Sequence, residues 1–133
     1  MRKLIPVIIA LSFFSKGFAD SLQDMKNIVS SFYSFQKVID SNMLSKDLDN
    51  ESLQIVVESL QKNIPVMEQG IQKAKQDGYN DIENLLSIYV TIAKLQLIQV
   101  SIVVDKKNQT TLHEYLTYRK QVMVLINIIK PMY

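Results

Sequence analysis

The most apolar stretch of the chain spans residues 80–105, and its hydrophobic positions recur at helical spacing. Residues three and four apart share one helix face, so each regular row of apolar side chains marks a buried face. Two rows run through this stretch, which predicts a central helix covered from two sides. The rows are Ile82, Leu86, Tyr89, Ala93, Val100 and Val103, and Leu85, Ile88, Ile92, Leu95 and Ile102. A narrow polar strip remains, made of Asn84, Ser87, Thr91, Lys94, Ser101 and Asp105.

Two helices are predicted before this stretch. The first begins at Ser21, a residue type that favours helix N-caps, and ends near Asn42. The second begins at Asp49 or Asn50, and Gly78 suits the left-handed position that follows a helix end. Asn80 is then expected to cap the central helix.

Pro65 lies inside the second predicted helix, where proline removes a hydrogen bond and usually bends the chain. The apolar row nevertheless keeps its alternating steps of four and three on both sides of Pro65, which favours one kinked helix over two separate helices. This row contains Leu53, Val57, Leu60, Ile64, Met67, Ile71 and Ala74.

The last helix is predicted to begin with a capping box at Thr111 and Glu114 and to stop before Pro131. Four amphipathic helices with short polar connectors favour antiparallel neighbours. The sequence therefore predicts an all-α fold, an up-down-up-down four-helix bundle. The core row of the last helix is Tyr115, Tyr118, Val122, Leu125 and Ile129, flanked by Leu112, Leu116, Met123 and Ile126.

The end of this last helix is apolar on all sides, which exceeds what one face of a bundle requires. Exposed apolar surface tends to mark sites of contact. We therefore expect binding to a protein partner, or pairing of two chains, with Val122, Val124 and Ile128 as candidate interface residues.

Residues 1–19 have the pattern of a secretory signal peptide: basic Arg2 and Lys3, an apolar run over 4–14, and small residues at Gly17 and Ala19. This pattern predicts cleavage after Ala19 and a periplasmic or secreted protein made of one helical domain, residues 20–133. The apolar run is shorter than the roughly 20 residues that span a membrane.

Removal of the signal peptide changes the charge of the chain. The full sequence has 15 basic and 13 acidic residues, and residues 1–19 hold three basic residues and no acid, which leaves 12 against 13 and a net charge of −1. Nucleic-acid binding therefore loses its main electrostatic support. We also expect no transmembrane span in the mature chain, because Glu83 and Lys94 interrupt its most apolar stretch.

The sequence contains one histidine, His113, and no cysteine. A structural metal site normally needs several such ligands, and no nucleophile motif or glycine-rich phosphate loop is present. The sequence therefore predicts no enzyme, no catalytic residue, no metal site and no cofactor, and His113 is expected to be exposed beside the capping box.

The start of the mature chain, from Ala19 to Met25, and the small exported helical architecture resemble the periplasmic cytochrome b562 family. The resemblance implies a haem held by a methionine early in the first helix, here Met25, and a histidine near the end of the last helix. His113 instead lies at the start of its helix, which is the opposite end of an up-down-up-down bundle. The sequence departs from the family at this ligand, so a haem or small-ligand carrier is the alternative function.

Three glutamines, Gln36, Gln96 and Gln99, occupy positions in the predicted core rows. A buried amide costs stability unless it is hydrogen-bonded, and it can fix the register of packed helices. Two interpretations stay open: control of register, and a polar-lined pocket between helices. The favoured function is an exported, non-enzymatic protein that acts by protein–protein binding, such as an inhibitor, an immunity protein or an adaptor.

Overall fold

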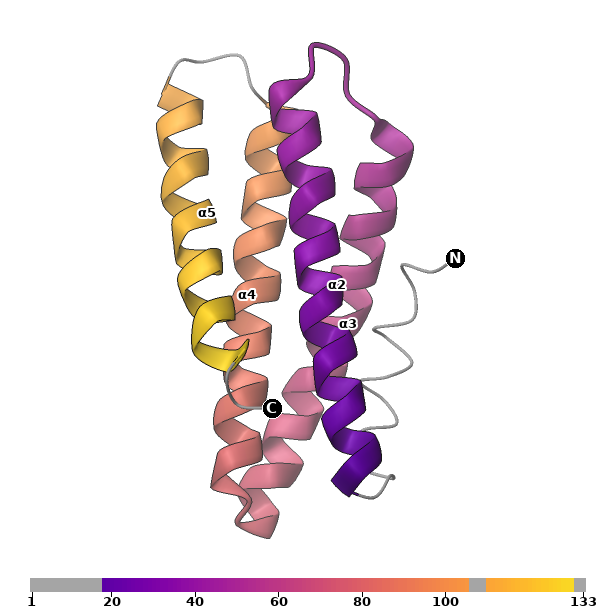
Figure 1. Ribbon diagram of the computed structural model, residues 1–133, viewed down its shortest axis with the longest axis vertical. Coiled ribbons are helices and arrows are strands. Elements are labelled where there is room, and N and C mark those ends of the chain that lie inside the picture. Colours follow the sequence, from indigo (N-terminus) through magenta and orange to yellow (C-terminus); the bar gives the residue numbers. More distant parts are fainter. Residues whose placement is uncertain (1–17, 106–109, 131–133) are drawn as a thin grey trace.

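The structure is a computed structural model that describes residues 18–105 and 110–130, with side chains described for residues 26–105 and 111–130. The described chain forms four helices that pack together, which confirms the all-α four-helix prediction. They are α2 (Phe18–Leu44), α3 (Asn50–Asp77), α4 (Asn80–Val104) and α5 (Thr110–Ile129). In Figure 1 the connector at residues 45–49 joins α2 and α3 at the upper end, and the turn at Gly78 joins α3 and α4 at the lower end.

Helix α4 is the central element of the bundle. It packs against α2, α3 and α5, whereas α2 also packs on α3. Its first predicted row is the deeper one, because every member from Leu86 to Val103 is buried and only Ile82 is partly exposed. All six residues of the predicted polar strip are exposed, so the predicted orientation of the helix is confirmed.

The apolar character of α4 follows from this central position. By length and composition alone, α4 is the one candidate for a membrane span among the described helices. A helix wrapped by protein on most sides passes the same test, since burial selects for the same residues. Tyr89, Ile92 and Ala93 at its middle are fully buried, and the Tyr89 ring lies 5.8 Å from the ring of Phe32 on α2.

Helix α3 runs without interruption through Pro65, which is exposed, so the prediction of one helix is confirmed. Asp49 caps its start, and the Asp49 carboxylate accepts a hydrogen bond from the Ser52 backbone N–H at 3.2 Å. Gly78 ends the helix with φ of 77°, in the left-handed region that glycine enters without steric cost. The predicted caps at both ends of α3 are therefore confirmed.

The other predicted helix starts are wrong by one to three residues. Helix α2 begins at Phe18 rather than Ser21, and it continues to Leu44. Tyr79 is the N-cap residue of α4, without a side-chain capping bond, and Asn80 is already helical. Thr111 lies inside the first turn of α5 and is buried, so it does not cap the helix. Helix ends fray, and their boundaries are commonly uncertain by one or two residues, so capping propensity alone does not fix the first helical residue. The predicted cleavage site precedes the described side chains, and Pro131 lies outside the described residues.

Candidate functional site

Two features of the described residues are candidates for function: a buried polar network between α2, α4 and α5, and the solvent-facing side of α5. The network begins with the three glutamines that the sequence placed in the core. Gln36 on α2 and Gln96 and Gln99 on α4 are all buried. Burial removes water from these amides, so their hydrogen bonds have to come from each other and from the backbone.

Gln36 and Gln99 form a reciprocal amide pair between α2 and α4. The Gln36 Nε2 donates to Gln99 Oε1 at 2.7 Å, and the Gln99 Nε2 donates to Gln36 Oε1 at 3.3 Å. A side-chain amide carries both a donor and an acceptor, so two glutamines can satisfy each other in this way. Because the pair forms only at one relative height of α2 and α4, it fixes their register.

Gln96 extends the network toward the centre of the bundle. Its Nε2 donates to the Phe32 backbone carbonyl at 2.9 Å and to Gln36 Oε1 at 3.4 Å. Its Oε1 is buried without a hydrogen-bond partner, as is Asn63 Oδ1 on α3. A buried unsatisfied acceptor costs on the order of 1–3 kcal/mol, so this layer of the core is less stable than an apolar one of the same shape.

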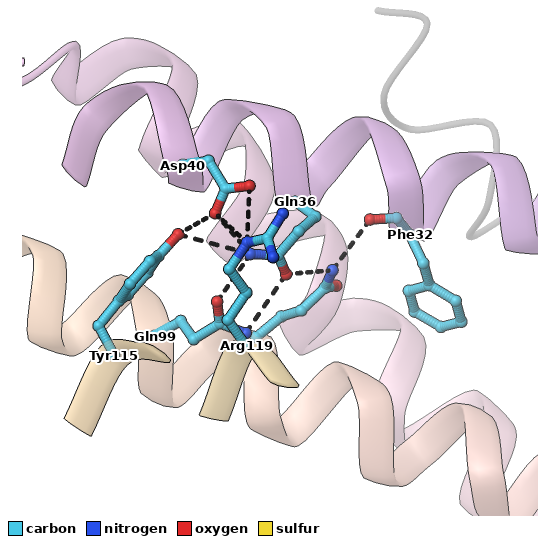
Figure 2. Close-up of polar contacts among 7 residues, drawn as sticks. Phe32, Gln36, Asp40, Gln99, Tyr115 and Arg119 are labelled. Carbon is cyan, nitrogen blue, oxygen red and sulfur yellow. Dashed lines mark hydrogen bonds and ion pairs between the residues drawn. The ribbon is translucent and has the colours of Figure 1, made fainter. Parts of the chain in front are cut away.

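Asp40 connects the amides to α5 at the edge of the bundle (Figure 2). It accepts hydrogen bonds from Gln36 Nε2 at 2.9 Å and from the Tyr115 hydroxyl. The Arg119 Nε approaches the two Asp40 oxygens at 3.1 and 3.2 Å. The Asp40 and Arg119 side chains are 26% and 40% exposed, so this ion pair stays partly in water and contributes modestly.

The electrostatics of the network favour a structural role for Tyr115 over a role in catalysis. Burial raises the pKa of the Tyr115 hydroxyl, and the hydrogen bond to Asp40 and its negative charge raise that pKa further, although Arg119 and Gln36 act in the opposite direction. The phenol therefore remains a protonated donor across the physiological range, and a group with so high a pKa is a poor general acid or base near pH 7. The arrangement favours register control over a ligand pocket, because its side chains fill the space between the helices with bonds to each other.

The sequence revealed the amides of this network but not its outer part. Asp40 and Arg119 received no role, and Tyr115 was predicted only as a core residue. The sequence did contain a signal for Asp40. It lies four residues after Gln36, on the same helix face, so its carboxylate could have been predicted to lie beside the buried amide. The position of α5 relative to α2 is what brings Tyr115 and Arg119 to it.

The predicted interface residues on α5 do not share one environment. Val122 is fully buried, at 0% exposure, so its assignment to an exposed interface is corrected. It lies four residues before buried Ile126 and seven after buried Tyr115, on the face of α5 that meets the core. Val124 and Ile128 are 50% and 52% exposed and are available for contact.

Two leucines at the start of α5 are also exposed, which differs from their prediction as flanks of the core row. Leu112 and Leu116 are each 51% exposed. Leu112 lies three residues before Tyr115, and Leu116 lies three residues before Arg119. The Tyr115 and Arg119 side chains reach α2 through polar bonds. Such bonds join the two helices at the network without covering the neighbouring apolar positions.

His113 is exposed in the first turn of α5, as expected. No group of three metal-binding side chains occurs among the described residues. The side chain of Met25, which the haem resemblance would require as a ligand, lies outside the described residues.

Comparison with protein-family models, with curated proteins and with solved structures finds no match for this chain.

Proposed function

We propose that this chain is an exported, non-enzymatic helical protein that acts by binding another protein, as an inhibitor, an immunity protein or an adaptor does. The active form in this proposal is residues 20–133, an up-down-up-down bundle in the periplasm or outside the cell, after cleavage of residues 1–19. The proposal follows from the export pattern of the N-terminal segment and from the surface of α5.

The observation that carries the proposal is the exposure of apolar side chains on the outer side of α5. Val124 lies two residues from each of buried Val122 and Ile126, and residues two apart point about 200° apart on a helix. Val124 therefore faces away from the core, and Ile128 follows it one turn later. Apolar side chains in this position gain free energy when a partner removes them from water.

Capture of binding proteins from cell-envelope extract tests this proposal. We expect Val124→Glu to lose the captured partner, because a carboxylate would have to be desolvated on docking. Gln69→Glu is the matched control, because Gln69 is exposed on α3 with Lys73 four residues on. The control should bind as the wild-type protein does, and equal binding by all three proteins would contradict the proposal.

His113→Ala separates protein binding from the haem-carrier alternative. We expect this variant to fold and to bind its partner as the wild type does, because His113 is exposed. A visible absorption band in the purified protein that disappears with His113→Ala would favour the alternative.

Export has its own test. N-terminal sequencing of the periplasmic protein should return Asp20 as the first residue, and Met1 in a membrane fraction would contradict cleavage.

A further inference from the structure

The buried side of α3 differs from the row that residue spacing predicts. Four members of that row are buried in the structure: Leu53, Leu60, Met67 and Ala74. The three residues that alternate with them, Val57, Ile64 and Ile71, are only partly buried. Their places are taken by the residues one position earlier, Val56, Asn63 and Gly70. The predicted row is therefore wrong at these three positions.

The observed orientation of α3 buries polar side chains and leaves isoleucine side chains partly in water. Ser59 and Asn63 are each 1% exposed, and Asn63 Oδ1 has no hydrogen-bond partner. Ile64, the neighbour of Asn63, and Ile71 keep part of their surface in water. A buried unbonded amide costs free energy, and a partly exposed isoleucine forgoes some of the gain of burial. The hydrophobic pattern of α3 by itself therefore favours a different orientation.

That second orientation can be derived from helix geometry. The residue three positions after a buried one lies about 60° to one side of it, and the residue four positions after lies about 40° to the other side. A rotation of α3 by roughly 50° about its own axis therefore exchanges the two rows. Leu53, Leu60, Met67 and Ala74 stay in the core in both orientations. After the rotation Ile64 and Ile71 enter the core, Asn63 moves to its edge and Ser59 faces water.

We infer that α3 has two packing orientations in the folded bundle, related by this rotation. The orientation in the structure covers Val56 and partly covers Val66, which lies on the same side as Ser59. The rotated orientation covers Val57, Ile64 and Ile71 instead and releases the unbonded amide. Each orientation buries apolar side chains that the other exposes, so the two are close in free energy and both are populated. Dense packing makes them two discrete states and not a continuous range.

The contacts on the outer side of α3 permit this rotation. The printed ion pair between α3 and α4 joins Glu68 and Lys94 at 3.7 Å, with both side chains more than half exposed. Such a pair contributes little to stability and re-forms easily in water. The rotation also changes the surface of α3, because it withdraws Ile64 and Ile71 and presents Ser59. A ligand that binds either surface would select one orientation, so α3 links its outer surface to the packing of the core.

Thiol labelling of the purified protein tests the rotation, because the chain has no cysteine and an introduced one is a single reporter. Ser59→Cys places a thiol of similar size at a position that is buried in the structure and faces water after rotation. Ala93→Cys, at a fully buried position of α4, reports global unfolding. We expect the thiol reagent DTNB to label Ser59→Cys about tenfold or more faster than Ala93→Cys, because rotation exposes only the first.

Second substitutions distinguish rotation from other kinds of opening. Ile64→Gln places an amide where the rotated orientation would bury it, so labelling of Ser59→Cys should slow about tenfold while labelling of Ala93→Cys does not slow. Asn63→Leu removes the unbonded amide from the observed orientation, and it should slow labelling of Ser59→Cys by a larger factor than labelling of Ala93→Cys. Gln69→Glu, at an exposed position of α3, is the control and should leave both rates unchanged.

Equal labelling rates for Ser59→Cys and Ala93→Cys would overturn the inference, because position 59 would then be reached only by global unfolding. An unchanged or faster rate for Ser59→Cys when Ile64→Gln is added would also overturn it, since that result indicates loosening of α3 and not rotation. Selective slowing by both Ile64→Gln and Asn63→Leu supports the two orientations. These outcomes do not depend on export or on a captured partner, so they leave the proposed function to its own tests.

Discussion

Helices α4 and α5 are both rich in apolar residues, but they differ in how many neighbouring helices cover them. Helix α4 contacts all three other helices, and its exposed side chains are polar except for Ile98 and, at the end of the helix, Val104. Helix α5 packs against α4, is bonded to α2 through Tyr115 and Arg119, and leaves four large apolar side chains half exposed. High apolar content therefore has a different consequence in each helix: in α4 most of these side chains are covered by neighbouring helices, and in α5 four of them stay half exposed to water.

Matched aspartate substitutions on the two helices give the largest expected difference. Ile92→Asp would bury an unpaired carboxylate at a fully buried position of α4, so we expect the free energy of unfolding to fall by about 4 kcal/mol or more. Ile128→Asp, on the exposed side of α5, should cost less than about 1 kcal/mol. Urea denaturation measures both changes, and equal losses would show that one of the two helices is oriented differently.

Removal of Asp40 should have the next largest effect and should act mainly on α5. Asp40→Ala leaves the buried Tyr115 hydroxyl and the Arg119 guanidinium without their acceptor, at an expected cost of about 2–3 kcal/mol. Amide hydrogen exchange should rise in α5 more than in α3, because the network ties α5 to α2. Asp77→Ala, at the exposed end of α3, is the control and should leave exchange in α5 unchanged. Uniform acceleration across all helices would contradict a local role for the network.

The Tyr115 hydroxyl should make stability depend on pH in the alkaline range. Its folded-state pKa is raised above the ordinary value of about 10, so its contribution is fully present below pH 10 and is lost as the pH rises further. Above pH 10 this single group should reduce the free energy of unfolding by about 1.4 kcal/mol per pH unit. Tyr115→Phe should be about 1 kcal/mol less stable at pH 7 and should lose this pH dependence, which the exposed-site control Tyr79→Phe retains. Parallel pH profiles for Tyr115→Phe and wild type would contradict the effect of burial on this group.

The smallest effect is expected on the outer strip of α4. The Lys94 ammonium lies 3.7 Å from a Glu68 carboxylate oxygen on α3, and both side chains are more than half exposed. Exposed ion pairs contribute about 0–1 kcal/mol, so Lys94→Ala should shift the free energy of unfolding by about 0.5 kcal/mol or less. Thermal unfolding measures this shift, and a loss comparable with that of Asp40→Ala would mean that the strip is covered by something other than water.

Local signals predicted the helices of this chain well. The spacing of apolar residues by three and four positions identified four helices. The same spacing predicted which side of α4 is exposed to solvent. The ends of α3 were predictable because Asp49 and Gly78 act on their own backbone neighbourhood. The starts of α4 and α5 were misplaced by one residue, which is within the uncertainty of one or two residues that helix ends carry.

The candidate sites were predicted only in part. The three core glutamines were visible because a polar residue breaks an otherwise regular apolar row. Their reciprocal bonds, and the extension to Asp40, Tyr115 and Arg119, depend on residues 60 to 79 positions apart in sequence. Leu112 and Leu116 illustrate the same limit, since the residue pattern placed both beside the core row and the packing of α5 leaves each of them half exposed.

The sequence by itself determined which segments are helical, that α4 lies at the centre, and that amides enter the core, because spacing along one helix is a local property. The tertiary structure decided that Leu112 and Leu116 beside the core row of α5 stay exposed, and which carboxylate meets the buried amides. The physical reason is that α5 carries apolar side chains on its outer side as well as in its core row, so its hydrophobic pattern alone does not show which of them are covered. The contacts of Tyr115 with Asp40 and of Val122 and Ile126 with the core select one orientation, and they leave Leu112, Leu116, Val124 and Ile128 exposed.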